Sequence, residues 1–286
     1  MKIPSRPVPG TKEYREWLAG VRKDYYDVLH KSDRFDICGL RPSTIFGGLQ
    51  ERICNERKPC PGLVVLYARL GLHRYNMLQG KNLELSHVKK FNKSTLTLPG
   101  SYYITLEAKD PDDFGSLQTF QALVNEVKYK LLVLTCTISR PLGETKKSHI
   151  SKSSFNISEL MPLESPPDFN PFKRFYVLKK SEVQDNDWIR LYLELAVATT
   201  NRSYEDHRHD LSKLKIIKVA IKTTPQDLEP HEILGAYDAT LYIRYKDSCE
   251  GKVVDRIAIV RRYLREKLAI LGSIHSSDTI IPKKEE

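Results

Sequence analysis

The densest group of titratable side chains in this sequence is the segment Glu205–Asp210, in which His207 and His209 alternate. Alternate residues of an extended strand point to the same face, so these two imidazoles could bind a metal ion together with Asp206 or Asp210. The competing interpretation is a solvated loop between a helix and a strand, which suits the arginine between the two histidines. We favour the loop and assign no metal site.

The cysteines offer the second candidate chemistry. There are five of them: Cys38, Cys54, Cys60, Cys136 and Cys249. Cys54 and Cys60 stand six residues apart, but no second pair completes a tetrahedral zinc site. Cys136 lies in an apolar strand, where a thiol is expected to be buried and inert rather than nucleophilic. The cysteines therefore predict neither a metal centre nor a catalytic thiol.

Catalytic motifs with a known mechanism do not occur in the sequence. It contains no G-x-S-x-G, P-loop, G-x-G-x-x-G or H-E-x-x-H pattern, which are typical of hydrolases, nucleotide-binding proteins and zinc proteases. We therefore predict a non-enzymatic protein with no catalytic residue and no cofactor.

The charge balance is basic. Lys and Arg number 46 against 36 Asp and Glu, giving a net charge of +10 and a pI near 9.2. Such a balance can indicate nucleic-acid binding, and the run 261–267 combines arginines with a tyrosine. Because the charge is spread along the chain and no nucleic-acid-binding motif occurs, a solubilising basic surface explains it better. A basic nucleic-acid-associated module is kept as the weaker alternative.

The N-terminal residues lack the apolar segment of a secretory signal, and no run approaches the roughly 18 apolar residues of a membrane span. We expect a reduced intracellular protein, cytoplasmic and/or nuclear, without a membrane partner.

Hydrophobic periodicity divides the chain into two similar series of elements. Helical spacing predicts helices over 10–36, 62–82 and 181–201, with Thr11 near the start of the first and Gly80 ending the second. Alternating patterns predict strands over 83–91, 101–109, 116–127, 129–138, 213–223, 235–247, 251–264 and 265–273. A Ser-, Pro- and Lys-rich segment, 141–172, separates the two series and is predicted to be a linker.

The two series also share short phrases. LYARLGLHRYN at 66–76 corresponds to LYLELAVATTN at 191–201, and LPGSYYITLEAKD at 98–110 corresponds to ILGAYDATLYIRYKD at 233–247. The same order of one helix followed by strands therefore occurs twice, which indicates an internal repeat.

The first series resembles plant cystatins. Ala68, Arg69, Tyr75 and Asn76 match their helix signature, and 102–108, YYITLEA, differs at one residue from their third strand. The resemblance implies an α+β fold of two cystatin/monellin-like repeats, each with one helix packed on an antiparallel sheet, behind an N-terminal helical extension. The expected domains are the extension 1–60, a first repeat 61–140, the linker 141–172, a second repeat 173–273 and a disordered tail 274–286.

The whole chain is also similar to an uncharacterised, crucifer-expanded plant family grouped with cystatin-related proteins, whose members include embryo-defective proteins. The residues that carry this resemblance are 32–36, 70–76, 103–108 and 186–188. It implies a non-enzymatic protein-interaction role in embryo or plant development, with the partner and the oligomeric state left open.

Inhibition of papain-like cysteine proteases is the alternative function that the cystatin resemblance implies. Cystatins insert a wedge into the protease cleft, formed in part by a glycine before the helix and a first hairpin. The matching positions here are Gly62, Leu96, Thr97, Leu98, Pro99 and Gly100. Of the hairpin residues, only Gly100 matches the cystatin pattern, and no Trp stands at the second hairpin near 127–130.

Overall fold

The computed structural model describes residues 7–37, 47–95, 98–144, 170–201, 210–224, 228–248 and 252–277. Several sequence predictions fall outside these ranges. They are the pair His207 and His209, the hairpin residues Leu96 and Thr97, linker residues 145–169 and tail residues 278–286.

The three long helices confirm the predicted helical periodicity. They are α1 (Lys12–Lys31), α2 (Gly62–Gln79) and α5 (Asp187–Thr200). Short helical turns are α3 (Pro171–Arg174), α4 (Lys180–Gln184), η2 (Leu211–Lys213) and α6 (Pro230–Ile233). The Thr11 hydroxyl accepts a hydrogen bond from the Tyr14 amide and caps α1, while Gly80 ends α2 with a left-handed φ of 61°. The helix predicted over 181–201 is interrupted between α4 and α5.

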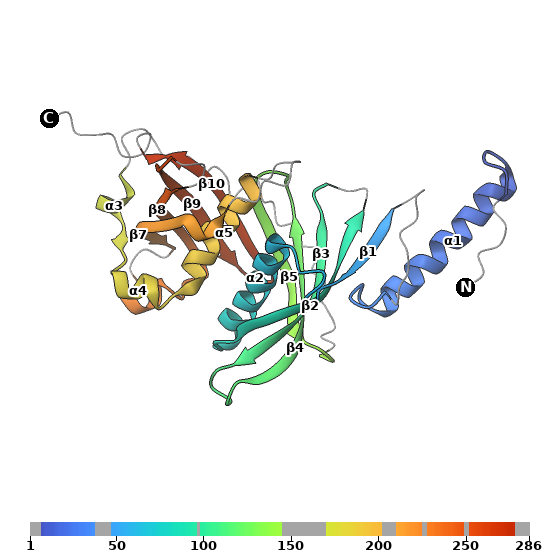
Figure 1. Ribbon diagram of the computed structural model, residues 1–286, viewed down its shortest axis with the longest axis horizontal. Helices are drawn as coiled ribbons and strands as arrows, with labels where there is room; N and C mark the ends of the chain where they lie inside the picture. The colour runs from blue at the N-terminus through green and yellow to red at the C-terminus, as the bar shows by residue number, and fades with distance from the viewer. Residues whose placement is uncertain are drawn as a thin grey trace.

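Ten strands form one continuous antiparallel sheet in the order β1-β2-β3-β4-β5-β10-β9-β8-β7-β6 (Figure 1). The first five are β1 (Gly48–Ile53), β2 (Glu84–Thr95), β3 (Ser101–Asp110), β4 (Ser116–Glu126) and β5 (Leu132–Pro141). The others are β6 (Tyr176–Val177), β7 (Leu214–Thr223), β8 (Asp238–Asp247), β9 (Val254–Leu264) and β10 (Leu268–Ser276). The eight predicted strands are present, whereas β1 and β6 were not predicted.

The predicted fold class of two cystatin-like repeats, each with one helix on its own sheet, behind an N-terminal helical extension is wrong. β10 pairs with β5 from Leu268↔Cys136 to Gly272↔Leu132, which joins the two series into a single sheet. The region expected to be a helical extension also supplies β1, which pairs with β2. An isolated sheet leaves unpaired amides and carbonyls along its edge strands, and the β5–β10 pairing satisfies those groups on both halves. Gly272 permits this approach, since a Cβ there would lie 2.6 Å from Leu132.

The main core lies between the sheet and the two helices α2 and α5, which cover the same face (Figure 1). Strand β3 shows how alternation builds it: Tyr102, Ile104 and Leu106 point into this core, while Tyr103 belongs to a separate cluster on the other face. Gly71 lets α2 cross β4 closely, because a Cβ there would lie 2.5 Å from the Cβ of Ala122.

Charged side chains link α2 to α5 along their contact. The Arg69 guanidinium donates to Glu194 Oε2 at 2.8 Å, and Arg190 Nε donates to Glu194 Oε1 at 2.8 Å. Glu194 is buried, so two arginines from different helices compensate one carboxylate that has little contact with water.

A second group of polar side chains lies where α2 and α5 meet the sheet, around Arg262 of β9. Arg262 is fully buried; it donates to the backbone carbonyls of Leu234 and Ala236, and its guanidinium lies 4.6 Å from the ring centroid of Trp188. The Tyr192 hydroxyl is hydrogen bonded to His73 Nε2 at 2.8 Å. Burial lowers the pKa of His73 and raises the pKa of Tyr192, while the charge of Arg262 acts to lower the pKa of both groups. We call this region, with Arg69, Glu194 and Arg190, the interhelical seam.

Candidate partner-binding site

The residues predicted for a protease-binding wedge lie in two places. Gly62 is the first residue of α2, and Leu98, Pro99 and Gly100 form the end of the connection between β2 and β3. Leu98 is 56% exposed, whereas Gly100 is buried. Leu96 and Thr97 lie outside the described residues, so the wedge as a whole stays a prediction.

Glu126 ties the described end of this connection to α2. Its Oε2 accepts from the Gly100 amide at 3.1 Å, and its Oε1 accepts from the Tyr67 hydroxyl at 2.8 Å. Glu126 is buried, and the Gly100 carbonyl in turn accepts from the Glu126 amide at 2.9 Å. Gly100 is therefore fixed to the body of the fold by hydrogen bonds in both directions.

Helix α1 stands beside the sheet next to β1 and contacts it with only its C-terminal end (Figure 1). Tyr25 and Leu29 are the buried residues of this helix. They pack with Phe35, Ile37, Leu49 and Tyr103 in a small cluster on the face of the sheet opposite α2. The Tyr25 hydroxyl also accepts a hydrogen bond from the Leu49 amide at 2.6 Å, which occupies one amide of the edge strand β1.

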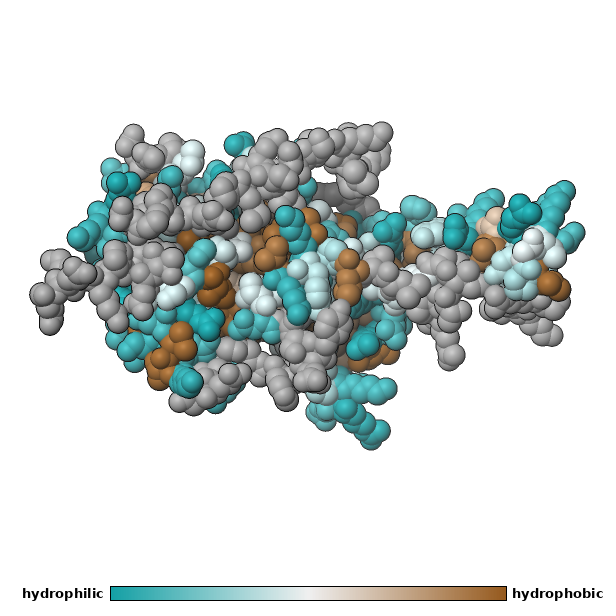
Figure 2. All heavy atoms as spheres, turned by 90° about the horizontal axis from the view of Figure 1, so that it is seen from above, coloured by the Kyte–Doolittle hydropathy of each residue, from teal (hydrophilic) through white to brown (hydrophobic). Residues whose placement is uncertain are grey.

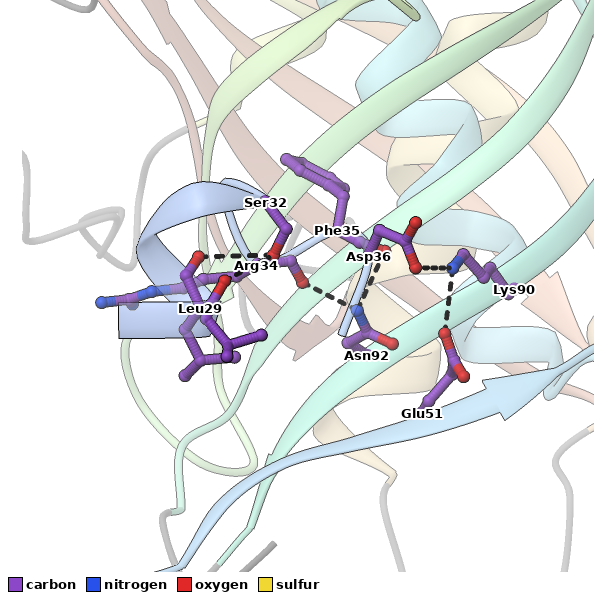
Figure 3. Close-up of polar contacts among 9 residues, drawn as sticks. Leu29, Ser32, Arg34, Phe35, Asp36, Glu51, Lys90 and Asn92 are labelled. Carbon is purple, nitrogen blue, oxygen red and sulfur yellow. Dashed lines mark hydrogen bonds and ion pairs between the residues drawn. The ribbon is translucent and has the colours of Figure 1, made fainter. Parts of the chain in front are cut away.

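The chain leaves α1 through a turn that is fixed by polar contacts to β2 (Figure 3). Asp33 and Arg34 both have left-handed φ angles, 47° and 68°, and the Arg34 amide donates to the Leu29 carbonyl. Buried Asn92 donates to the carbonyls of Arg34 and Phe35, at 2.7 and 3.1 Å. The Arg34 amide thus pairs a carbonyl at the helix end, and Asn92 pairs two carbonyls of the turn that follows it.

Lys90 adds a charged contact at the same place (Figure 3). Its Nζ lies 3.2 Å from Asp36 and 2.9 Å from Glu51, bridging the turn after α1 to β1. Partial burial alone would lower the pKa of Lys90, but the hydrogen bonds to Glu51 and Asp36 outweigh it and raise that pKa. We call these contacts of Asn92 and Lys90, together with the Tyr25 cluster, the α1 anchor.

Beyond its anchor, α1 continues for several turns away from the sheet (Figures 1 and 2). A helix of this length, 20 residues, extends roughly 30 Å. Tyr14, Trp17, Leu18 and Val21 follow one another at helical spacing on one side and are intermediate in exposure; we call them the α1 stripe. The remaining positions between Lys12 and Asp24 carry mostly charged, exposed side chains of both signs. This is the pattern of a helix that presents one apolar side.

Metal and thiol chemistry have little support in the part of the chain that the structure describes. No group of three or more His, Cys, Asp or Glu residues there is placed to hold a metal ion. Cys136 is buried, and burial raises the pKa of its thiol to about 12, which confirms the expected inert cysteine. None of the described helices is both long and apolar enough to cross a membrane.

Sequence reasoning missed the α1 anchor and the partners of His73. A helix was predicted as far as residue 36, whereas α1 ends at Lys31 and the turn that follows it is held to β2 by Asn92. His73 has no partner close to it in the sequence. Its partner, Tyr192, lies 119 residues further along the chain, and no local pattern indicates such a contact.

Comparisons with known proteins found consistent matches to plant proteins. A family model described as Protein MS5 matches residues 161–272. The UPF0725 protein At1g02770 of Arabidopsis thaliana is 42% identical over 264 residues, covering 88% of this chain and 82% of that protein. The UPF0725 protein EMB2204 of the same species is 42% identical over 270 residues, covering 90% and 76%. The crystal structure of MS5 from Brassica napus matches with a TM-score of 0.62 and 33% identity, covering 76% of this chain and 99% of that chain.

Proposed function

The chain belongs to the plant family of MS5 and the UPF0725 proteins, and from this premise we propose that it is a non-enzymatic protein that binds another protein through α1. The resemblance to a plant family with an embryo-defective member is confirmed by these matches, whereas the resemblance to cystatins is not. The proposal sets this binding inside the cell, in the cytoplasm and/or nucleus, and in embryo or plant development. The family member named EMB2204 supports the developmental part of this proposal.

The observation that carries the proposal is the one-ended attachment of α1. Only Tyr25 and Leu29 of its 20 residues are buried, while the α1 stripe continues the apolar side away from the sheet. Helices of this kind bind by laying their apolar side into a groove of a partner, with anchors at i, i+3, i+4 and i+7. Trp17 is the largest side chain of the stripe, and buried Trp residues dominate the binding energy of such contacts. The expected partner is a protein with an apolar groove rimmed by charges of both signs.

The predicted protease wedge is not part of this proposal. Gly100 is buried and hydrogen bonded to Glu126 in both directions, whereas a wedge needs its hairpin glycine at a surface that a partner can approach. The basic net charge is likewise left out, because several arginines of the second half are paired with carboxylates: Arg244 with Asp255 and Arg261 with Asp238.

The test uses three versions of the full chain: wild type, the double variant Trp17→Ala with Val21→Ala, and the matched control Arg15→Ala with Lys23→Ala. The control changes exposed charged residues of the same helix. Affinity purification from plant extract at high salt identifies proteins held by wild type. A purified candidate is then titrated against all three versions by calorimetry.

We expect wild type and control to bind the candidate alike, and the stripe variant to bind at least about 30-fold more weakly, which corresponds to about 2 kcal/mol. Circular dichroism and urea unfolding verify that all three versions are folded. Equal binding by all three versions contradicts the proposal, as does purification of wild type without any partner retained at high salt.

A further inference from the structure

The loop between β1 and α2 brings two cysteines together. Directly after β1, the Cys54 amide donates to the Lys89 carbonyl at 2.9 Å, so the start of the loop is held to β2. Asn55 and Lys58 then exchange backbone hydrogen bonds of 3.0 and 3.1 Å and form a tight reversal. The Asn55 side chain also accepts from the amides of Arg57 and Lys58. This reversal turns the chain back, and the cysteines on either side of it, Cys54 and Cys60, line one cavity.

The two cysteines line one surface cavity. Both are free and partly exposed, and Cys54 lies close enough to raise the pKa of the Cys60 thiol. The cavity measures about 980 Å³ and is also lined by His87 and the apolar side chains of Val65 and Leu85. A small molecule in this cavity therefore lies beside both cysteines without unfolding of the sheet. Cys136, in contrast, is buried in the main core and does not line this cavity.

This pair is suited to forming a covalent bond rather than to holding a metal ion. No third His, Cys, Asp or Glu completes a metal-binding group around it among the residues that the structure describes. Two thiols on either side of a tight reversal can reach disulfide distance by side-chain rotation, whereas two distant thiols would need the backbone to move.

We propose that Cys54 and Cys60 are a reversible modification site, which closes to an intramolecular disulfide by exchange with a small disulfide of the glutathione class. The bond would tie the end of β1 to the start of α2 beside the cavity. This inference is independent of partner binding by α1 and stands or falls separately from it.

The reaction balances in two exchange steps. One thiol of the pair loses its proton, and its thiolate attacks a sulfur of glutathione disulfide; a mixed disulfide forms and one glutathione thiolate leaves. The second thiol then loses its proton and attacks the protein sulfur of the mixed disulfide, releasing the second glutathione thiolate. The two protons pass to the two released glutathiones. The protein pair is thereby oxidised by two electrons, and one glutathione disulfide is reduced to two glutathione thiols.

Burial, followed by the contact with Cys54, raises the pKa of the Cys60 thiol. Cys60 therefore carries little thiolate at neutral pH, so exchange is slow and the mixtures need long equilibration.

The test equilibrates the full, folded chain in glutathione buffers of increasing disulfide content, traps free thiols with an alkylating reagent and maps the peptides after trypsin digestion. Trypsin cleaves after Arg57, between the two cysteines, so the disulfide appears as two linked peptides that separate on reduction. We expect this linked pair to form and to return to free thiols in reducing buffer. The equilibrium constant for forming the disulfide with glutathione should be at least about tenfold larger in the folded chain than in urea, because the fold holds the thiols near each other.

Three variants control the result. Cys54→Ser and Cys60→Ser should each abolish the linked pair, whereas Cys136→Ala should leave it unchanged. If the Ser variants fail to fold, the proposal is judged on wild type alone, by comparing the equilibrium constant for disulfide formation in the folded chain and in urea. The proposal is overturned if Cys54 and Cys60 stay separately alkylated in the most oxidising buffer, if they stop at mixed disulfides with glutathione, or if folded and urea-treated chains give the same equilibrium constant.

Discussion

The interhelical seam and the α1 anchor are two joints of the same molecule, and they differ in how much of a helix they bury. At the seam, α5 buries most of its residues against α2, β5, β9 and β10. At the anchor, α1 buries only Tyr25 and Leu29. Because burial of apolar area is the main source of stability, the seam should unfold only with the whole sheet, whereas α1 can detach by itself.

The polar chemistry of the two joints differs in the same direction. The seam contains a fully buried arginine, Arg262, whose partners are two backbone carbonyls and an aromatic ring. The anchor relies on Asn92, which satisfies two carbonyls, and on Lys90, whose carboxylate partner Asp36 is exposed. A buried charge without its partners is costly, while exposed ion pairs contribute little. The difference indicates that the seam fixes the fold and that the anchor positions a helix for binding.

The largest expected effect comes from making the same truncation at both joints. Leu195 in α5 is 0% exposed and Leu29 in α1 is 3% exposed, so Leu→Ala removes equally buried atoms. We expect Leu195→Ala to lower the free energy of unfolding by about 2–5 kcal/mol. Leu29→Ala should lower it by at most about 1 kcal/mol, since the loss is limited to the free energy with which α1 docks.

Urea unfolding followed by circular dichroism measures the first quantity, and hydrogen exchange of the α1 amides measures the docking of α1. Faster exchange confined to α1 is expected for Leu29→Ala. Equal losses of global stability for the two variants would show that α1 and the seam belong to one cooperative unit.

A second, pH-dependent effect should appear only at the seam. Burial, followed by the charge of Arg262, lowers the pKa of His73 from 6.5 to about 3. Between these pH values the unfolded chain binds a proton that the folded chain does not, so the contribution of His73 to stability is complete above about pH 6.5 and decreases as the pH falls. From pH 6.5 to 5 this loss amounts to about 2 kcal/mol.

The test compares the free energy of unfolding of wild type and His73→Gln at about pH 7.5 and pH 5, by the same denaturation method. The difference between the two proteins in the stability that they lose isolates the contribution of His73. Wild type should lose more stability than the variant over that interval. An identical loss in both proteins would contradict a neutral, buried His73 in the folded chain.

The smallest expected effect compares the two tyrosine hydroxyls that serve these joints. Tyr25→Phe removes the acceptor of the Leu49 amide and should weaken the docking of α1 by about 1 kcal/mol, which raises hydrogen exchange in α1 about fivefold. Tyr192→Phe removes the hydroxyl that is hydrogen bonded to His73 and should shift the global unfolding midpoint instead. A global shift for Tyr25→Phe, or unchanged exchange in α1, would remove the distinction between the joints.

Local elements were predictable because their signals are local. The Thr11 cap, the Gly80 stop and the alternation in β3 each depend on a few neighbouring residues, and each is present. The alternation in β3 does not indicate that Tyr103 is buried as well, because only the end of α1 covers the other face of the sheet there. The break between α4 and α5 was missed, since the apolar spacing of 181–201 continues across it.

The candidate site was predictable only in part. The apolar spacing of α1 was visible in the sequence, including Trp17 and Val21, but the sequence did not show that its apolar side is buried at one end only. Cys54 and Cys60 were noted as a spaced pair, yet their contact depends on the reversal at Asn55 and Lys58.

By itself, the sequence determined the type and order of the long elements, their repetition and the plant family, because periodicity, caps and shared phrases are properties of neighbouring residues. Only the tertiary structure decided that the two series form one sheet. Backbone amides and carbonyls at a strand edge are nearly the same for every residue, so sequence barely specifies which edges pair. The β5–β10 pairing and the contact of His73 with Tyr192 depend on how the whole chain closes around one core.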